Sequence, residues 1–191
     1  GEYQPVAQEG EEEENVPLPE VRYVEKSIDE LLEQAGEEAV LSILALWDRE
    51  DEENLNLLAV CAGEQIILHR PQEGALYEQQ LIRLFNAPNP KVTFDCKSLY
   101  HWTLRRGSAI ANLADDILLS AYLLAANNNG YEIDRLCAEY SAGRRAEGMP
   151  EEMEEDCRKL LTHCASLLPL HEKLSAEIAA NGQDKLLHEM E

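Results

Sequence analysis

The sequence lacks the cysteine patterns that define disulfide frameworks and zinc ribbons. Its cysteines number five, which is odd, and no Cys-x-x-Cys pair occurs. Cys157, His163, Cys164 and His171 lie on one predicted helix and could in principle bind a metal. We interpret the cysteines as buried thiols of a reducing compartment, because free cysteine behaves as a small apolar residue and intracellular thiols stay reduced.

A long apolar run is also lacking. The longest one, residues 117–126, is interrupted by Ser120 and is far shorter than the roughly 20 residues that cross a bilayer. No stretch has the pattern of a signal peptide. We therefore expect a soluble, cytoplasmic protein that makes no contact with a membrane.

Basic residues are scarce as well. Lys and Arg number 16 against 38 Asp and Glu, which gives a formal net charge of −22. Proteins bind nucleic acid by neutralising phosphates with Lys and Arg, so we expect the isolated chain to bind DNA weakly. Adjacent arginines occur only at Arg105-Arg106 and at Arg144-Arg145.

The 191 residues suit a single domain preceded by an acidic segment. Residues 1–20 are acidic and contain Pro5, Pro17 and Pro19, a composition that predicts a disordered linker. Residues 21–191 form the predicted domain. Hydrophobic residues make up 45% of the chain, which is enough for a globular core.

Three apolar runs near the start of this domain predict an antiparallel meander. The runs cover residues 40–47, 55–61 and 66–68. A charged turn, residues 48–53, separates the first two, and Gly63 precedes the third. Short β-compatible runs bounded by turn signals are typical of consecutive hairpins.

Helix and strand signals alternate around and after this meander. Before it, Ser27 and Glu30 form a capping box ahead of a helix that Gly36 ends. Later patterns predict a helix over 77–85, a strand over 91–94, a helix over 98–106 and a strand over 109–113. Two more helices follow, one from Asp115 or Asp116 to about 126 and one over 131–140. A last helix is predicted to start near Pro150 and to be kinked or divided by Pro169. The helix after Asp116 is apolar nearly all round, so we expect it to be central. This order predicts an α/β fold, a mixed sheet of about five strands flanked by helices, with the first three strands antiparallel.

Four segments together carry a resemblance to a known family. They are residues 91–99 (KVTFDCKSL), 113–124 (LADDILLSAYLL), 131–136 (YEIDRL) and 186–191 (LLHEME). In this order they resemble the 3′–5′ exonuclease domain of family A DNA polymerases, the bacterial DNA polymerase I type. In that family a segment N-x-K-x-D precedes F-D-x-x-x-x-x-Y-x-L. The resemblance implies a ribonuclease H-like fold for residues 21–191 and a junction to a polymerase domain after Glu191.

The chemistry of this family implies four carboxylates that hold two divalent metal ions. The first two carboxylates belong to a D-x-E sequence on the first strand. If the second strand is matched at residues 55–60, these positions fall on Leu44 and Leu46, or on Ser42 and Leu44. Neither pair can provide the carboxylates that the metals need.

If the hairpin is shorter, other residues occupy the D-x-E positions. In that register Asp48 and Glu50 supply the D-x-E sequence. The two residues also suit a solvated hairpin turn within a run of charge, and the sequence leaves both interpretations open.

The remaining two carboxylate positions are also altered. Because Lys97 matches the lysine of the family, Leu99 stands where the third carboxylate belongs, and Asp95 stands where the family has Asn. The fourth position falls on Asp156 in one register of the last helix and on Lys159 in another. Asp156 also suits an ordinary surface position of a helix.

These departures imply a vestigial, catalytically inactive exonuclease domain of a DNA polymerase I. We expect it to support the DNA-synthesising domain in replication and repair, and we expect Leu44, Leu46 and Leu99 to pack together in the old cleft. No cofactor is expected. One alternative is an active proofreading exonuclease that uses Asp48, Glu50, Asp95 and Asp156 with Mg²⁺ or Mn²⁺, and another is an unrelated acidic α/β interaction domain.

The resemblance also implies the partners. The polymerase domain of the same chain is the expected one, and DNA is expected only through that parent protein. We expect the chain to be monomeric and to make no membrane contact.

Overall fold

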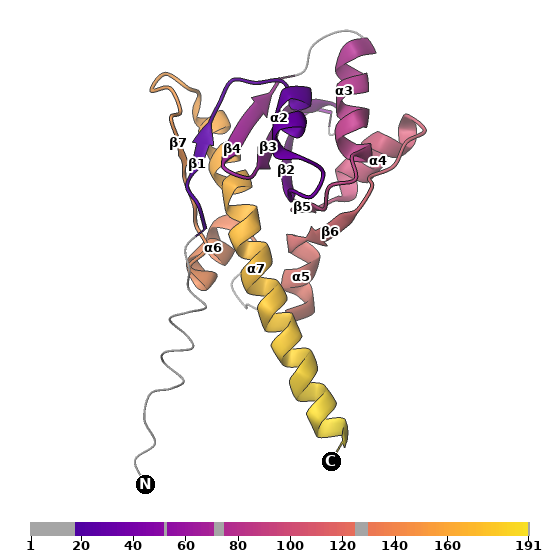
Figure 1. The fold of residues 1–191 in the computed structure, drawn as a ribbon, viewed down its shortest axis with the longest axis vertical. Helices are drawn as coiled ribbons and strands as arrows, with labels where there is room; N and C mark the ends of the chain where they lie inside the picture. The colour runs from indigo at the N-terminus through magenta and orange to yellow at the C-terminus, as the bar shows by residue number, and fades with distance from the viewer. Residues whose placement is uncertain (1–17, 52, 71–74, 125–129, 191) are drawn as a thin grey trace.

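The computed structural model describes residues 18–51, 53–70, 75–124 and 130–190 of the chain (Figure 1). Its strands are β1 (Val21–Tyr23), β2 (Leu41–Trp47), β3 (Leu55–Ala62), β4 (Gln65–His69), β5 (Lys91–Thr93), β6 (Leu113–Asp116) and β7 (Ala146–Glu147). Its helices are α2 (Ile28–Ala35), α3 (Ala75–Asn86), α4 (Lys97–Arg105), α5 (Ile117–Leu124), α6 (Ile133–Tyr140) and α7 (Glu155–Met190). The predicted linker over residues 1–20 lies mostly outside the described residues.

The strands form one mixed sheet in the order β6-β5-β2-β3-β4-β1-β7. The predicted meander is confirmed, because β2 pairs antiparallel with β3, and β3 pairs antiparallel with β4. Strands β5 and β6 extend one edge in parallel, and β1 and β7 extend the other. The sheet has seven strands where the sequence predicted about five, because β1 and β7 are too short to leave a periodic pattern.

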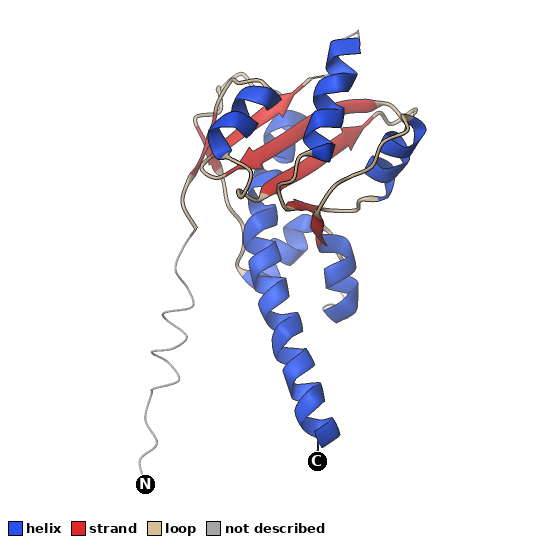
Figure 2. Ribbon diagram, turned by 45° about the vertical axis from the view of Figure 1, so that its right-hand side comes forward, coloured by secondary structure: helices blue, strands red, loops and turns tan. Residues whose placement is uncertain are grey.

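Each face of the sheet carries its own hydrophobic core. Along β2, Leu41 and Ile43 join a cluster with α2, α3 and α4, whereas Leu44 and Leu46 join a cluster with α5, α6 and α7. This alternation follows from the two-residue period of a strand. In Figure 2, α2 and α3 lie in front of the sheet and α7 passes behind it. Strand β2 is therefore buried on both sides, which explains its continuous apolar sequence.

Local signals place the first helix as the sequence predicted. The Glu30 amide donates to Ser27 Oγ at 3.1 Å, and Ser27 Oγ lies 3.1 Å from Glu30 Oε1. Helix α2 ends at Gly36, whose φ of 79° suits a residue without a side chain. The predicted N-cap at Ser27 is therefore confirmed, and the Glu30 carboxylate reaches back to the Ser27 hydroxyl.

The strand predicted over residues 109–113 is wrong. The Ala111 amide donates to the Phe85 carbonyl at 2.8 Å, and the Ala111 carbonyl accepts from the buried Lys91 Nζ at 2.6 Å. Asn112 then takes a φ of 53°, which ends any extended run. Burial away from carboxylates lowers the pKa of Lys91 to about 8. These side-chain and loop contacts replace strand pairing, and β6 begins only at Leu113.

The expected start of the last helix is also wrong. Helix α7 begins at Glu155 and not near Pro150, because residues 150–153 form a turn in which the Met153 amide donates to the Pro150 carbonyl at 3.2 Å. Pro169 does not divide α7, which runs as one helix from Glu155 to Met190. The helix packs against α5, α6 and five of the strands before it leaves the sheet.

Helix α5 is less central than its apolar sequence predicts. Ile117 and Ala121 are buried against α7, but Leu119, Tyr122 and Leu123 are exposed. The expectation of a central helix is therefore wrong for the side of α5 that carries these three residues.

Candidate functional site

Leu44 and Leu46, the residues that the resemblance implies at the D-x-E positions if the second strand is matched at residues 55–60, lie on β2. Leu44 pairs with Ala59 and Leu46 pairs with Leu57, so both lie inside the strand. Leu44 is 7% exposed and belongs to the cluster that contains Leu161 of α7. Neither side chain carries an atom that could ligate a metal.

Helix α7 crosses β2 close to these residues. The Cys164 thiol donates to the Ser42 carbonyl at 3.3 Å, which places the two elements in contact. The first turns of α7 bury Cys157, Leu160 and Leu161 toward the sheet. The space facing Leu44 is therefore lined by thiol and alkyl groups.

Asp156 and Lys159, the two residues expected at the fourth carboxylate position, are both exposed. Asp156 and Lys159 lie on α7 but on its solvent side, whereas Cys157 between them is fully buried. Because adjacent residues of a helix point in directions about 100° apart, neither Asp156 nor Lys159 shares the buried face of the helix.

Leu99 is buried, as expected, but not beside Leu44. It is 4% exposed and belongs to the cluster of α2, α3 and α4, where Trp102 also lies. Leu44 belongs to the cluster on the opposite face of the sheet. The expectation that Leu44, Leu46 and Leu99 pack together is therefore wrong, because α4 and α7 cover different faces.

Asp95 occupies a turn between β5 and α4. It is exposed, and its φ is 61°. Its amide donates to Asp116 Oδ1 at 2.8 Å, and the Cys96 amide donates to Asp116 Oδ2 at 2.9 Å. Asp116 also accepts from the Leu118 amide at 3.0 Å, so it caps α5 as one of the two predicted residues. The buried Asp116 carboxylate is thus used to fix the turn.

Asp48 and Glu50 lie in the turn between β2 and β3. The Asp48 amide donates to the Asn54 carbonyl at 2.9 Å, which closes the hairpin. Asp48 Oδ1 accepts from the Glu50 amide at 3.0 Å. Both residues are exposed, and the Asp48 carboxylate already stabilises its own turn.

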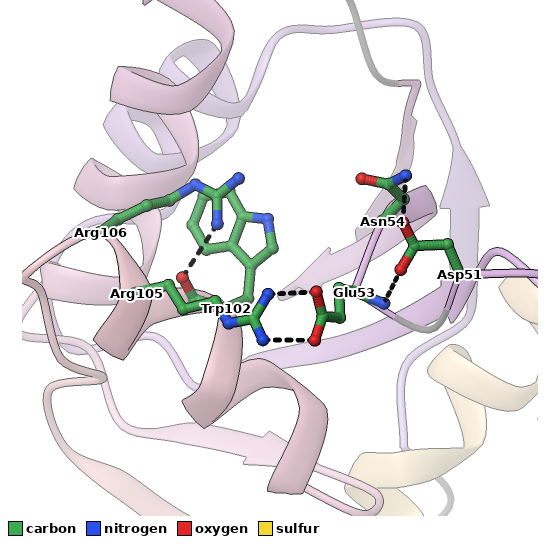
Figure 3. A network of polar contacts seen from close by, with 6 residues as sticks. All are labelled: Asp51, Glu53, Asn54, Trp102, Arg105 and Arg106. Carbon is green, nitrogen blue, oxygen red and sulfur yellow. Dashed lines mark hydrogen bonds and ion pairs between the residues drawn. The ribbon is translucent and has the colours of Figure 1, made fainter.

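An ion pair connects this hairpin to α4 (Figure 3). Glu53 binds both terminal nitrogens of Arg105, and this contact lowers the pKa of Glu53. The Asp51 carboxylate accepts from the Glu53 amide at 3.1 Å and from Asn54 Nδ2 at 3.0 Å. The acidic turn is thereby tied to α4 on the face of the sheet away from Leu44.

One partly buried polar cluster was not predicted from the sequence. His171 Nδ1 of α7 lies 2.6 Å from Asp115 Oδ2, and Ser120 Oγ donates to Asp115 Oδ1 at 2.5 Å. The hydrogen bond with Asp115 raises the pKa of His171. Ser175 Oγ lies 3.3 Å from the same His171 Nδ1. Because Asp115 and Ser175 approach one nitrogen, the imidazole cannot relay a proton between them as in a hydrolase triad.

The candidate metal ligands on α7 point to separate partners. His163 contacts Asp134, His171 contacts Asp115 and Cys164 contacts Ser42. Burial raises the pKa of Cys164 well above its ordinary value, which opposes the thiolate that a metal requires. Within the described ranges, no three His, Cys, Asp or Glu residues form a group that could hold a metal ion.

The interpretation of the cysteines as thiols agrees with the structure. All five are free, and Cys61, Cys157 and Cys164 are buried. In the part of the chain that is described, no helix combines the length and apolar character needed to span a bilayer.

Comparisons with known proteins give a fold but no family by sequence. No protein-family model matches the chain, and no curated protein sequence matches it. Pol1 from M. smegmatis, solved as the POL domain with DNA primer-template and dNTP, is similar in structure, with a TM-score of 0.65 and 15% identity over 83% of this chain. The matched region is 28% of the Pol1 chain.

Two further solved structures are similar. Brucella melitensis NrnC has a TM-score of 0.61 and 10% identity over 87% of this chain and 85% of its own. Escherichia coli RNase D, an exoribonuclease involved in structured RNA processing, has a TM-score of 0.57 and 17% identity over 85% of this chain and 46% of its own. NrnC has also been solved with bound Mg²⁺.

The chain therefore has a ribonuclease H-like fold, which it shares with NrnC and RNase D. At these identities the likeness establishes the fold alone. The fold makes up most of the NrnC chain but only part of the much longer Pol1 chain. The fold alone therefore does not decide the function, which has to be argued from the chemistry of the site.

Proposed function

We propose that this chain is a catalytically silent 3′–5′ exonuclease-like domain of a family A DNA polymerase. Its role is to support the DNA-synthesising domain that follows Glu191 in the same protein during replication and repair. It contacts DNA only through that protein, is monomeric and works in the cytoplasm.

The main support for this proposal is the chemistry of the residues at the expected metal-binding positions. Two-metal catalysis requires carboxylates from separate elements that converge on one pocket. Leu44 and Leu46 offer no donor, Leu99 is buried on the other face of the sheet, and Lys159 carries a positive charge. Mg²⁺ and Mn²⁺ bind oxygen ligands, so these residues do not fit the metal ions of an exonuclease.

The four acids of the active alternative lie on three different elements. Asp48 and Glu50 occupy the β2–β3 turn, Asp95 precedes α4 and Asp156 is on the exposed side of α7. Glu53 of the same turn is bound to α4 on the face opposite to α7. The acids therefore give no support to a shared metal site.

A nuclease assay tests the proposal. The chain is incubated with labelled single-stranded DNA and RNA oligonucleotides in Mg²⁺ and in Mn²⁺, beside an Asp48→Ala/Glu50→Ala variant. We expect no shortening of either substrate by either protein. Metal-dependent shortening by the native chain that the double variant loses would establish an active site in the turn and overturn the proposal.

A further inference from the structure

Helix α5 presents an apolar face that this chain leaves uncovered. Leu119, Tyr122 and Leu123 are 55%, 51% and 77% exposed. Their spacing of three and four residues places them on one side of the helix. These three residues, called the α5 face below, are half of the six large hydrophobic side chains exposed in the described part of the chain.

The sequence of α5 is suited to burial on all sides. Its eight residues include seven apolar or aromatic ones, and Ser120 turns inward to donate to Asp115. A helix that is apolar all round is ordinarily buried, and clustered exposed apolar residues mark an interaction site. Ile117 and Ala121 are covered by α7, so a partner on the opposite side would complete the burial.

The place of α5 in the fold indicates which partner covers it. Figures 1 and 2 show α5 beside α7 at the end of the molecule where α7 extends beyond the sheet. A domain joined to the end of α7 would lie at the same end of the molecule as α5. The proposed function places a polymerase domain there, and the present inference rests on it.

Charge argues against a second copy of this chain as the occupant. The formal net charge is −22, so two copies repel each other. Tyr122 packs edge-on against Tyr131 with ring centroids 4.4 Å apart. The exposed charged residues after Tyr131 and on this part of α7 include more acids than bases: Glu132, Asp134, Arg135, Glu172, Lys173 and Glu177. A surface with an apolar centre and Lys or Arg around it is complementary to this region.

We propose that the α5 face is the docking surface for the polymerase domain of the same protein, which meets it with an apolar patch rimmed by basic residues. The contact fixes the direction in which α7 leaves the exonuclease-like domain. It gives the silent domain a physical means of supporting its neighbour.

The test compares the 191-residue chain with the full-length product of its gene. Hydrogen exchange of α5 is measured in both, at low and at high salt. The variant Leu119→Ser/Leu123→Ser alters the α5 face, and the matched control Leu76→Ser/Leu104→Ser alters two leucines that are 75% and 65% exposed on α3 and α4. Thermal unfolding is followed for all proteins.

We expect α5 amides to exchange at least about tenfold more slowly in the full-length protein than in the short chain. The α5 variant should lose this protection and lower the melting temperature of the full-length protein. The control variant should do neither, and both variants should leave the short chain nearly unchanged because the altered side chains are exposed.

The outcomes separate the two proposals. A gene product without a polymerase domain after Glu191 would overturn the proposed function and this inference together. A polymerase domain that leaves α5 exchange unchanged, with both variants behaving alike, would overturn this inference alone. Protection of α5 that appears in the short chain as its concentration rises would assign the face to a second copy instead.

Discussion

His171 Nδ1 of α7 and Asp115 Oδ2 of β6 lie 2.6 Å apart, across 56 residues of sequence. The Asp115 side chain is 7% exposed and that of His171 is 25% exposed. The contact joins α7 to the edge of the sheet just before α5 begins. It therefore fixes α7 at the point where the helix leaves the sheet.

This contact predicts a dependence of stability on pH. The hydrogen bond with Asp115 raises the pKa of His171, and the nearby Glu172 acts in the same direction. A base whose pKa is raised by folding stabilises the folded state fully below its unfolded pKa, about 6.5 for histidine. That contribution is lost as pH rises through the folded pKa. We expect the melting temperature of the native chain to exceed that of His171→Gln most at about pH 6 and least at about pH 9.

A second histidine provides the control. His163 contacts Asp134, whose side chain is 73% exposed, at 2.8 Å. Exposed pairs contribute little, so His163→Gln should change the melting temperature less. A difference between the native chain and His171→Gln that stays constant across this pH range would show that the imidazole acts by packing and not by charge.

The meander and the first helix could be predicted because residues close together in the sequence specify each of them. The apolar runs of β2, β3 and β4 are separated by charge or glycine, so their pairing as a meander could be predicted. Ser27, Glu30 and Gly36 define the ends of α2 by local hydrogen bonds and backbone freedom. Both signals act over a few residues, which is the range that a single sequence reports.

The errors involve contacts between distant segments. The Lys91 ammonium donates to the Ala111 carbonyl, and the chain around Ala111 forms a loop where a strand over 109–113 was predicted. His171 meets Asp115 without any local pattern that pairs them. The burial of Leu99 could be predicted from its apolar character, but the face of the sheet that it joins depends on where α4 packs.

The arginines predict weak binding of single-stranded DNA. Arg105 is bound to Glu53, and Arg106 lies 3.9 Å from the centre of the Trp102 ring and 3.1 Å from a Glu78 oxygen. Arg144 donates to the carbonyls of Ala165 and Pro19. At about 0.15 M salt we expect a dissociation constant no tighter than about 1 µM for a fluorescent oligonucleotide, measured by anisotropy.

An Arg105→Gln variant tests whether any binding depends on this surface. Its affinity should equal that of the native chain, because Arg105 is already neutralised by Glu53. Sub-micromolar binding that this substitution abolishes would show that the guanidinium exchanges Glu53 for phosphate.

Carboxylates placed at Leu44 and Leu99 should not create a metal site. In Leu44→Asp/Leu99→Asp the new acids enter hydrophobic clusters on opposite faces of the sheet, so they cannot share an ion. Each ionised carboxylate would lose its hydration without gaining a partner, at several kcal/mol per group. We expect denaturant unfolding at a much lower midpoint and no heat of Mn²⁺ binding by calorimetry.

The control Leu104→Asp, at a leucine that is 65% exposed, should leave the midpoint nearly unchanged. The variant Leu46→Glu, at a partly buried position, keeps the test valid if the double variant does not fold, and it too should bind no Mn²⁺. A stable double variant that binds Mn²⁺ would show that Leu44 and Leu99 face one pocket in solution, and that the silent site lost its chemistry by substitution alone.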